Sequence, residues 1–241
     1  MDAVWLVDGR IADSAVADSG FDPAATARVF VERGNHDVLI ATGYGRHSAR
    51  ESFACQVVTE IKAYAAGASI LFPGAASVLD IGGQDTKVIT LSATGKVTDF
   101  EMNDKCAAGT GKFLEVMARA LGFTLEEMAS EAIAASRTVA ISSMCTVFAE
   151  SEVTGLVHRG ESRSAIARGL HESIARRTVS SLKRVGATGP LVFAGGVAKN
   201  PAMVALVRRE FTGDVLVPGE SETDSQIVGA FGAALCGLPV G

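Results

Sequence analysis

The chain has 241 residues, of which 48% are hydrophobic and 20% charged, and its formal net charge is −5. This balance is typical of a folded globular protein of one large or two modest domains, and it excludes disorder as the default state. The negative charge argues against nucleic acid and anionic membranes as partners, no run reaches the ~20 apolar residues of a membrane span, and no secretory signal is visible, so we expect a cytoplasmic protein.

The first third of the chain predicts short strands and helices. Apolar runs at 4–7 and 11–16 are joined by Asp8-Gly9, a pair that favours a hairpin turn. Asp22-Pro23 predicts the start of a helix that reaches Gly34. A buried strand, a glycine-bearing loop and a long helix are expected next, at 38–41, 42–46 and 52–66.

The rest of the chain predicts two β-rich parts with a helical block between them. Strands are expected at 77–81, 86–91, 96–102, 191–194 and 215–217. Helices are expected at 106–121, from 124, at 146–158, from 162 or 164 to 185, from 201, and at 225–235. We therefore predict an α/β protein with a cleft between two lobes, at 1–75 and 76–241.

Two predicted strands each end in a pair of glycines, Gly82-Gly83 and Gly195-Gly196. Glycine lets backbone N–H groups approach a phosphate closely, and Asp80 at the first strand end can hold a water bound to Mg²⁺. Each pair alone is equally explained as an ordinary turn, and Asn200 before Pro201 as a helix cap. Two such elements framing a helical block favour a nucleotide site more than either one does.

The chain has four cysteines and no CxxC pair, so neither a zinc ribbon nor a disulfide framework is indicated. Cys106 and Cys145 stand at the starts of predicted helices, where the helix dipole favours the thiolate that ligates iron–sulfur clusters. Two thiolates are half of a four-thiolate site, which a second chain related by a two-fold axis would complete. The simpler interpretation is two unconnected thiols. Cys55, inside a predicted helix, and Cys236, near the end of the closing helix, are expected core residues.

Six stretches together resemble one family. They are ATGYGR (41–46), LDIGGQDTKVI (79–89), MNDKCAAGTGKFLEVMA (102–118), AISSMCTVFAESEV (140–153), FAGGVAKN (193–200) and QIVGAFGAAL (226–235). Over nearly its whole length the chain resembles the activators of 2-hydroxyacyl-CoA dehydratases and the ATPase subunits of benzoyl-CoA reductase.

The resemblance implies an actin/hexokinase-like (ribonuclease H-like) ATPase fold that binds ATP or ADP with Mg²⁺, and one [4Fe–4S] cluster shared by two subunits. It implies Cys106 and Cys145 as cluster ligands. At the phosphates it implies Asp80 and Gln84 as catalytic residues with Gly82 and Gly83, and at the adenosine Gly195, Gly196 and Asn200. The helix after Cys106 would link nucleotide to cluster. The implied partners are a second copy or a sister subunit, reduced ferredoxin or flavodoxin as electron source, and a CoA-thioester dehydratase or reductase.

One part of the family pattern is not found. The family opens with a strand and a phosphate loop of the form Asp-x-Gly-Ser-x-x-x-Lys, and nothing like it precedes Val4, while Asp8-Gly9 is followed by Arg10. We therefore expect the first strand of the fold to be missing, the N-terminal lobe to be truncated, and ATP hydrolysis by the chain as written to be weak or absent. The alternatives are a non-hydrolysing partner subunit and a small-molecule kinase on the same fold, which would need a positioned carboxylate and no cluster.

Overall fold

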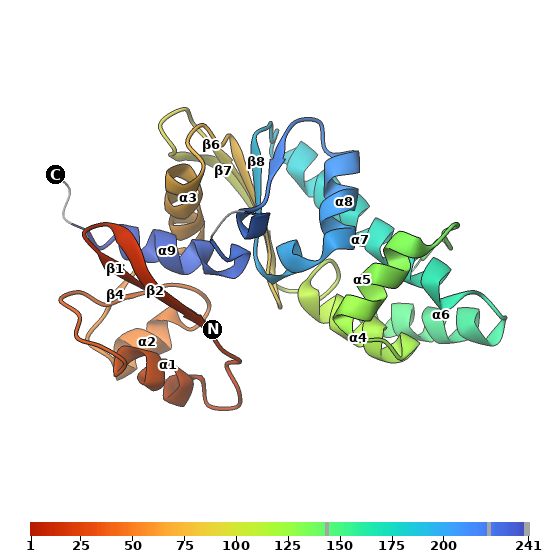
Figure 1. Ribbon diagram of the computed structural model, residues 1–241, viewed down its shortest axis with the longest axis horizontal. Helices are drawn as coiled ribbons and strands as arrows, with labels where there is room; N and C mark the ends of the chain where they lie inside the picture. Colours follow the sequence, from red (N-terminus) through yellow and green to blue (C-terminus); the bar gives the residue numbers. More distant parts are fainter. Residues whose placement is uncertain (143–144, 221–222, 239–241) are drawn as a thin grey trace.

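The computed structural model describes residues 1–142, 145–220 and 223–238. Among these residues, five strands form a central mixed sheet, seen in the middle of Figure 1. In sheet order they are β7 (Val97–Asn103), β6 (Thr86–Leu91), β5 (Ser77–Ile81), β8 (Leu191–Ala194) and β9 (Val215–Leu216). β5 runs antiparallel to β6 and parallel to β8. The strands predicted at 77–81, 86–91 and 191–194 are confirmed with the same bounds.

Helices cover both faces of this sheet. One face carries Val78, which packs in an apolar cluster with residues of α3 (Glu60–Leu71). The other face carries Leu79, which belongs to the larger cluster built with α4 (Gly111–Leu121), α7 (Arg163–Arg184) and α8 (Pro201–Glu210). Side chains alternate across a strand, so neighbouring residues of β5 supply opposite layers. The three layers agree with the predicted α/β class.

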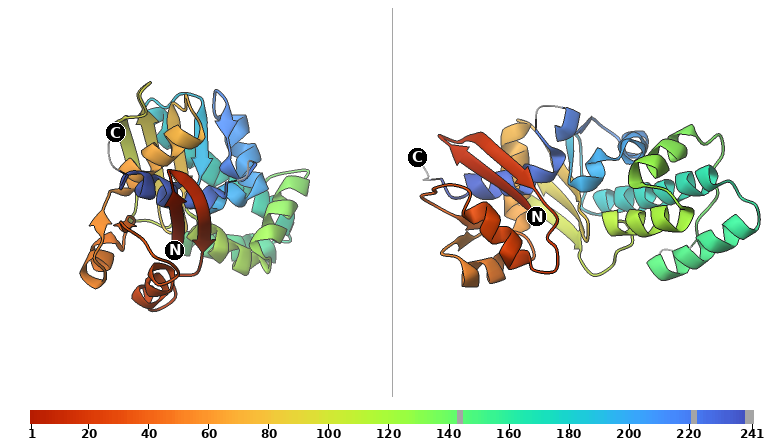
Figure 2. Two further views of the ribbon diagram at one scale, coloured as in Figure 1. Left: turned by 60° about the vertical axis from the view of Figure 1, so that its left-hand side comes forward. Right: turned by 60° about the horizontal axis from the view of Figure 1, so that its bottom comes forward.

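The helices between β7 and β8 form a block that extends beyond the sheet. In Figure 1 and in the right-hand view of Figure 2 this block lies at the opposite end of the molecule from the N-terminal strands. Besides α4 and α7 it contains α5 (Leu125–Ala134) and α6 (Thr146–His158). Thr124 caps α5 with a capping box and Ser162 caps α7, as the sequence predicts. Within the described ranges, no helix is both long and apolar enough to cross a membrane.

The N-terminal part contains two small sheets that are separate from the central one. β1 (Asp2–Val7) and β2 (Arg10–Val16) form the predicted hairpin, and β3 (Ile40–Ala41) pairs in parallel with β4 (Gln56–Val57). At the hairpin turn Asp8 and Gly9 both have positive φ, 51° and 75°, as the tightest hairpin turns require. The predicted cap Asp22 accepts a hydrogen bond from Ala25 at the start of α1 (Pro23–Val31).

The helix predicted from Ser52 to Ala66 is confirmed only from Glu60 onward, and its first part is wrong. α2 (Arg46–Ser52) ends where that helix was to begin, and the chain then extends to pair β4 with β3. A new helix, α3, starts at Glu60, because the Thr59 side chain caps it by accepting a hydrogen bond from the Lys62 N–H. The composition of 52–66 fits a helix, but the strand partner in β3 is a tertiary contact that composition does not indicate.

The C-terminal helix α9 (Val228–Leu235) joins the two parts of the molecule. It crosses α3 so closely that a Cβ atom on Gly232 would lie 1.8 Å from the Ala63 carbonyl oxygen. It also contacts β1 and β3. The structure divides the closing helix predicted at 225–235 into a short 3₁₀ turn, Ser225–Ile227, and α9.

Candidate nucleotide and metal site

The two Gly-Gly turns meet at one edge of the central sheet. β5 and β8 are parallel neighbours with Asp80 opposite Ala194, so both strands deliver their glycines to the same edge. Gly195 has a φ of +86°, and a Cβ atom there would lie 2.4 Å from Asp80 Oδ1 and 2.5 Å from the Ile81 carbonyl oxygen. Only glycine fits this position, because the backbone is left-handed and the space is already filled.

A third segment holds Gly195 in place. The Gly195 N–H donates to the Ser225 carbonyl oxygen at 2.9 Å, and the Ser225 hydroxyl donates to the Gly195 carbonyl oxygen at 3.1 Å. Ser225 is buried although it follows a polar stretch, and sequence reasoning identified it only as a helix start. The edge of the sheet is therefore built from three segments that are far apart in the sequence.

Asp80 carries a buried ion pair that the sequence did not reveal. Its Oδ2 atom lies 3.0 Å from Lys87 Nζ, and both side chains are 1% exposed. The same ammonium lies 2.8 Å from Asp85 Oδ1 and 3.2 Å from Glu60 Oε1. Asp80 and Lys87 are direct partners in the β5–β6 register, so the sheet itself sets this contact.

Burial and the neighbouring charges oppose each other in this cluster. Burial raises the pKa values of Asp80 and Glu60, and the Lys87 ammonium lowers both. The pKa of Tyr64 lies well above its ordinary value, because the hydroxyl is buried and faces the negative charge of Asp80. The Tyr64 hydroxyl is near enough to affect the pKa of Asp80, but no hydrogen bond of normal geometry reaches Asp80 Oδ1 among the described residues.

The unpartnered Oδ1 makes this edge suitable for a hydrated cation. A buried carboxylate oxygen without a donor is costly, and Mg²⁺ prefers such oxygens, often through retained water. Beside it, the Gly82 N–H donates to the Asp85 carbonyl oxygen at 3.0 Å in a tight turn, which leaves Gly83 and Gln84 exposed at the surface. Asp80, Gly82, Gly83, Gln84, Gly195 and Gly196 therefore share one edge, and the residues present fit a magnesium nucleotide.

The Asn200 side chain, predicted to lie at the adenosine, makes hydrogen bonds within the fold through both its oxygen and its nitrogen. Its Oδ1 accepts from the Met203 N–H at 3.0 Å and caps α8, as the simpler interpretation of Asn200-Pro201 predicts. Its Nδ2 donates to His171 Nε2 at 3.1 Å, and His171 Nδ1 donates to the Ala167 carbonyl oxygen at 2.7 Å. His171 is fully buried, and its neutral form donates through one ring nitrogen and accepts through the other.

The buried His171 predicts a loss of stability in mild acid. Burial lowers its pKa below the ordinary 6.5, so the unfolded chain takes up a proton in a range where the folded chain does not. The contribution of neutral His171 to the free energy of unfolding should therefore be fully present above about pH 6.5. At lower pH this free energy should decrease, by at most about 1.4 kcal/mol per pH unit. Urea denaturation at pH 7, 6 and 5 measures this slope. His171→Gln should have a shallower slope, and equal slopes in both proteins would exclude His171 as the cause.

Cys106 lies at the exposed tip of a compact loop and not at a helix start. The Asn103 side chain holds this loop by donating to the carbonyl oxygens of Cys106 at 2.8 Å and Ala108 at 3.2 Å. The Thr110 hydroxyl donates to Ala107 at 2.7 Å. These bonds keep the chain out of helical geometry until Gly111, so the helix predicted from Cys106 begins five residues later.

Cys145 occupies the position that the sequence predicts. It is the exposed N-cap residue of α6, and the residues before it, 143 and 144, lie outside the described part of the chain. Val147 and Phe148 in the first turn of α6 are two-thirds exposed. α4 packs against α6, so the two cysteine segments lead into a pair of neighbouring helices.

The Cys106 loop and the first Gly-Gly turn are joined by backbone hydrogen bonds. The Gly111 and Lys112 N–H groups donate to the Gly82 and Gly83 carbonyl oxygens, each at 2.8 Å. A Cβ atom on Gly111 would lie 3.1 Å from the Gly82 carbonyl oxygen, so the close approach favours glycine. The Gly82-Gly83 turn and the start of α4 are thus held together by their backbones.

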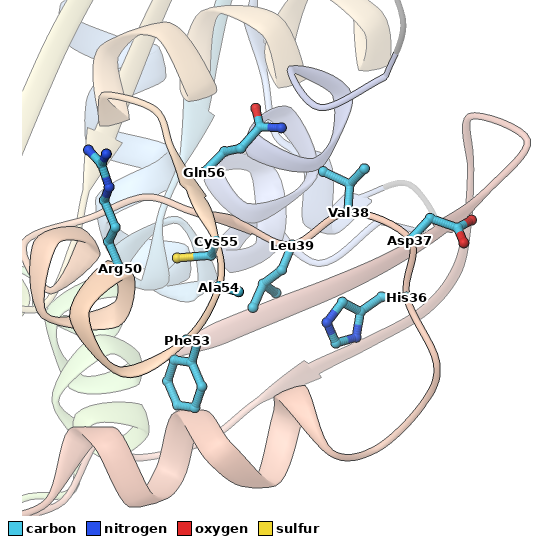
Figure 3. A pocket seen from close by; sticks show the side chains of 9 residues that line it. All are labelled: His36, Asp37, Val38, Leu39, Arg50, Phe53, Ala54, Cys55 and Gln56. Carbon is cyan, nitrogen blue, oxygen red and sulfur yellow. The ribbon is translucent and has the colours of Figure 1, made fainter.

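The remaining cysteines lie elsewhere. Cys55 precedes β4 outside any helix, so its predicted place in a helix is wrong, and Cys236 follows the end of α9 as predicted. Both are only half-buried, so neither is the fully buried core residue that was expected. Figure 3 shows Cys55 lining a surface hollow of about 500 Å³ with its sulfur toward Arg50 and with His36 on the opposite side. Partial burial raises the pKa of the Cys55 thiol, and Arg50 opposes this shift. Among the described residues, no group of three or more His, Cys, Asp or Glu side chains is arranged to hold a metal ion.

Known proteins match the chain across most of its length. It is 47% identical to the activator of lactoyl-CoA dehydratase from Anaerotignum propionicum, over 81% of this chain and 73% of that protein. It is 36% identical to one of the subunits of benzoyl-CoA reductase from Thauera aromatica, over 83% of this chain and 71% of that protein.

The structure is also similar to that of a solved relative. The activator of 2-hydroxyisocaproyl-CoA dehydratase from Clostridium difficile, solved with bound ADPNP, aligns with a TM-score of 0.84 and 35% identity, covering 97% of this chain and 88% of that chain. The predicted actin/hexokinase-like ATPase fold is thereby confirmed. Residues 24–237 match the BadF/BadG/BcrA/BcrD ATPase family, and the chain belongs to that family.

Proposed function

We propose that this chain is an ATP-dependent iron–sulfur electron donor that activates a CoA-thioester dehydratase or serves a CoA-thioester reductase. Membership of an ATPase family supports the nucleotide half of this proposal. Relatives named as a dehydratase activator and as part of benzoyl-CoA reductase support the partner class. The same donor would serve either reaction, because specificity for the CoA ester lies in the partner enzyme.

The nucleotide would bind at the edge where the Gly-Gly turns meet. The Gly82-Gly83 turn would lie against its phosphates with the Gly83 N–H facing them, because the Gly82 N–H is already bonded to the Asp85 carbonyl oxygen. Asp80 would hold a magnesium-bound water through Oδ1, and Gln84 would orient the attacking water. Gly195 and Gly196 would lie against the adenosine. Asn200 would contribute by fixing the start of α8, since its side chain is already engaged.

The thiols of Cys106 and Cys145 would ligate a cluster shared with a second subunit. Both thiols are exposed and neither is in a disulfide, so they are available as thiolate ligands. The exposed Val147 and Phe148 beside Cys145 supply an apolar surface that a second copy or a sister subunit would cover. When bound, a [4Fe–4S] cluster supplies a one-electron carrier of low potential.

The observation that carries the proposal is the pair of hydrogen bonds from α4 to the Gly82-Gly83 turn. The turn that would respond to the phosphates is thereby bonded to the helix that follows the Cys106 loop. Nucleotide binding would shift α4 and change the surroundings of the Cys106 thiolate, while hydrolysis by the chain as written is expected to be weak or absent. An electron taken from ferredoxin or flavodoxin would then pass to the partner enzyme.

Anaerobic purification tests the proposal. We expect a brown protein with about two irons per chain, from four irons shared by two subunits. Reduced and given Mg-ATP, it should activate a purified 2-hydroxyacyl-CoA dehydratase, measured as dehydration of the CoA ester. A colourless protein that phosphorylates a small-molecule hydroxyl would overturn the proposal in favour of a kinase.

A further inference from the structure

Lys87 is a fully buried cation enclosed by carboxylates from separate segments. Its Nζ contacts Asp80 at the end of β5, Asp85 in the following turn and Glu60 at the start of α3, all within 3.2 Å. It also lies 5.5 Å from the centre of the Tyr64 ring. Lysine is very seldom fully buried without a partner, so this position in β6 is a built ionic site.

The charges of this site do not cancel. Three carboxylates face one ammonium, so the cluster keeps an excess of two negative charges. Glu60 and Asp85 are about one-fifth exposed, which gives the cluster an outer edge that reaches solvent. Asp80 Oδ1 is buried, has no hydrogen-bond partner among the described residues and lies beside Gly195. A buried carboxylate oxygen without a hydrogen-bond partner is costly, and one more positive partner would offset that cost.

Lys87 determines which oxygen of Asp80 remains available. The Lys87 ammonium donates a hydrogen bond to Asp80 Oδ2 at 3.0 Å, and Asp80 Oδ1 lies on the side of Gly195. The ammonium also occupies the space between the three carboxylates, which among the described residues are not arranged to hold a metal ion by themselves. To bind here without a nucleotide, a divalent cation would have to displace the Lys87 ammonium, which its own side chain holds in this buried site.

We propose that Lys87 is an internal counterion that orients Asp80 and keeps free divalent cations out of the Glu60–Asp80–Asp85 cluster, so that Mg²⁺ enters only together with a nucleotide. This inference rests on the nucleotide site proposed above. Lys87 is therefore a positioning residue and does not touch the substrate. Glu60 is part of the same charge cluster. A Cβ atom on Gly43, in the ATGYGR stretch, would lie 3.9 Å from Glu60 Oε1, so this loop lies close to the proposed nucleotide site.

Binding of Mn²⁺ in the absence of nucleotide tests the proposal directly. Lys87→Met keeps the length of the side chain and removes its charge. It should bind free Mn²⁺ at least about tenfold more tightly than the wild type, measured by electron paramagnetic resonance of the unbound ion. Lys62→Met, which removes an exposed lysine from α3, is the matched control and should bind Mn²⁺ like the wild type. Equal Mn²⁺ binding by Lys87→Met and Lys62→Met would overturn the proposal.

Glu60→Gln supplies a second test that leaves the lysine in place. With one carboxylate fewer, Lys87 neutralises Asp80 more completely, so the Mg²⁺ concentration for half-maximal ADPNP binding should rise about tenfold. Binding of ADPNP in EDTA should not change. An unchanged Mg²⁺ requirement would overturn the proposal even if Lys87→Met does not fold. Failure of the proposed function is distinguished separately, because the wild type would then bind no ADPNP with Mg²⁺.

Discussion

Cys106→Ser and Cys145→Ser should each purify under anaerobic conditions as folded, nearly colourless protein that has lost most of its iron. Serine is close in size to cysteine, but its hydroxyl is a hard ligand that stays protonated at neutral pH and replaces a cluster thiolate poorly. Both cysteines are exposed, so the substitution leaves no cavity in the core. Iron per chain and the visible absorbance of the cluster are the measurements.

The other two cysteines provide the controls. Cys55 lines the surface hollow in the N-terminal part and Cys236 follows α9, and both are half-buried. Cys55→Ser and Cys236→Ser should therefore keep about two irons per chain. Loss of iron from all four variants would indicate a general defect in folding or assembly. Retention of iron in Cys106→Ser would show that the assigned ligand is wrong.

Gly195→Ala should abolish Mg-nucleotide binding and destabilise the fold. Its backbone lies at φ +86°, and the added Cβ would meet Asp80 Oδ1 at 2.4 Å and the Ile81 carbonyl oxygen at 2.5 Å. Backbone strain and overpacking together should lower the free energy of unfolding by roughly 2–6 kcal/mol. The same clash displaces the oxygen that would face magnesium, so affinity for Mg-ADPNP should fall at least about 100-fold. Calorimetric titration measures the affinity and urea denaturation the stability.

Two other glycines separate the clash from a general effect of adding a methyl group. A Cβ on Gly196 would lie 3.6 Å from the Gln226 side chain, an ordinary contact, so Gly196→Ala should keep the stability of the wild type. Gly34 has open space around it and lies far from the sheet edge in the sequence, so Gly34→Ala should keep both stability and nucleotide affinity. If Gly195→Ala binds Mg-ADPNP like Gly34→Ala, the nucleotide lies elsewhere.

The sequence predicted those elements whose ends carry strong local signals. Gly-Gly pairs follow β5 and β8, and α5, α7 and α8 are capped by Thr124, Ser162 and Asn200, which are good capping residues. The common edge of the two Gly-Gly turns could be predicted only in part. That two such motifs frame one helical block is visible in the sequence, but their contact depends on β5 and β8 being parallel neighbours.

The parts that sequence reasoning missed depend on long-range contacts. A two-residue strand at 56–57 exists because β3 is there to pair with it. The late start of α4 depends on the Asn103 side chain, which bonds the Cys106 loop instead of solvent. Lys87 looks like an ordinary polar residue of a strand, and nothing in the local sequence indicates that three carboxylates, one of them from α3, surround it.

The position of α9 joins the N-terminal strands of the chain to a helix that follows them by more than 150 residues. The last described helix supplies the packing partner of α3 and contacts β1 and β3, so apolar residues such as Val58 and Ala63 are covered by Ala233. During synthesis the N-terminal strands emerge long before this partner does. Such contacts between distant parts of a chain form late and slow the folding of the whole. The N-terminal part therefore reaches its final packing only after the ribosome has completed residues 228–235.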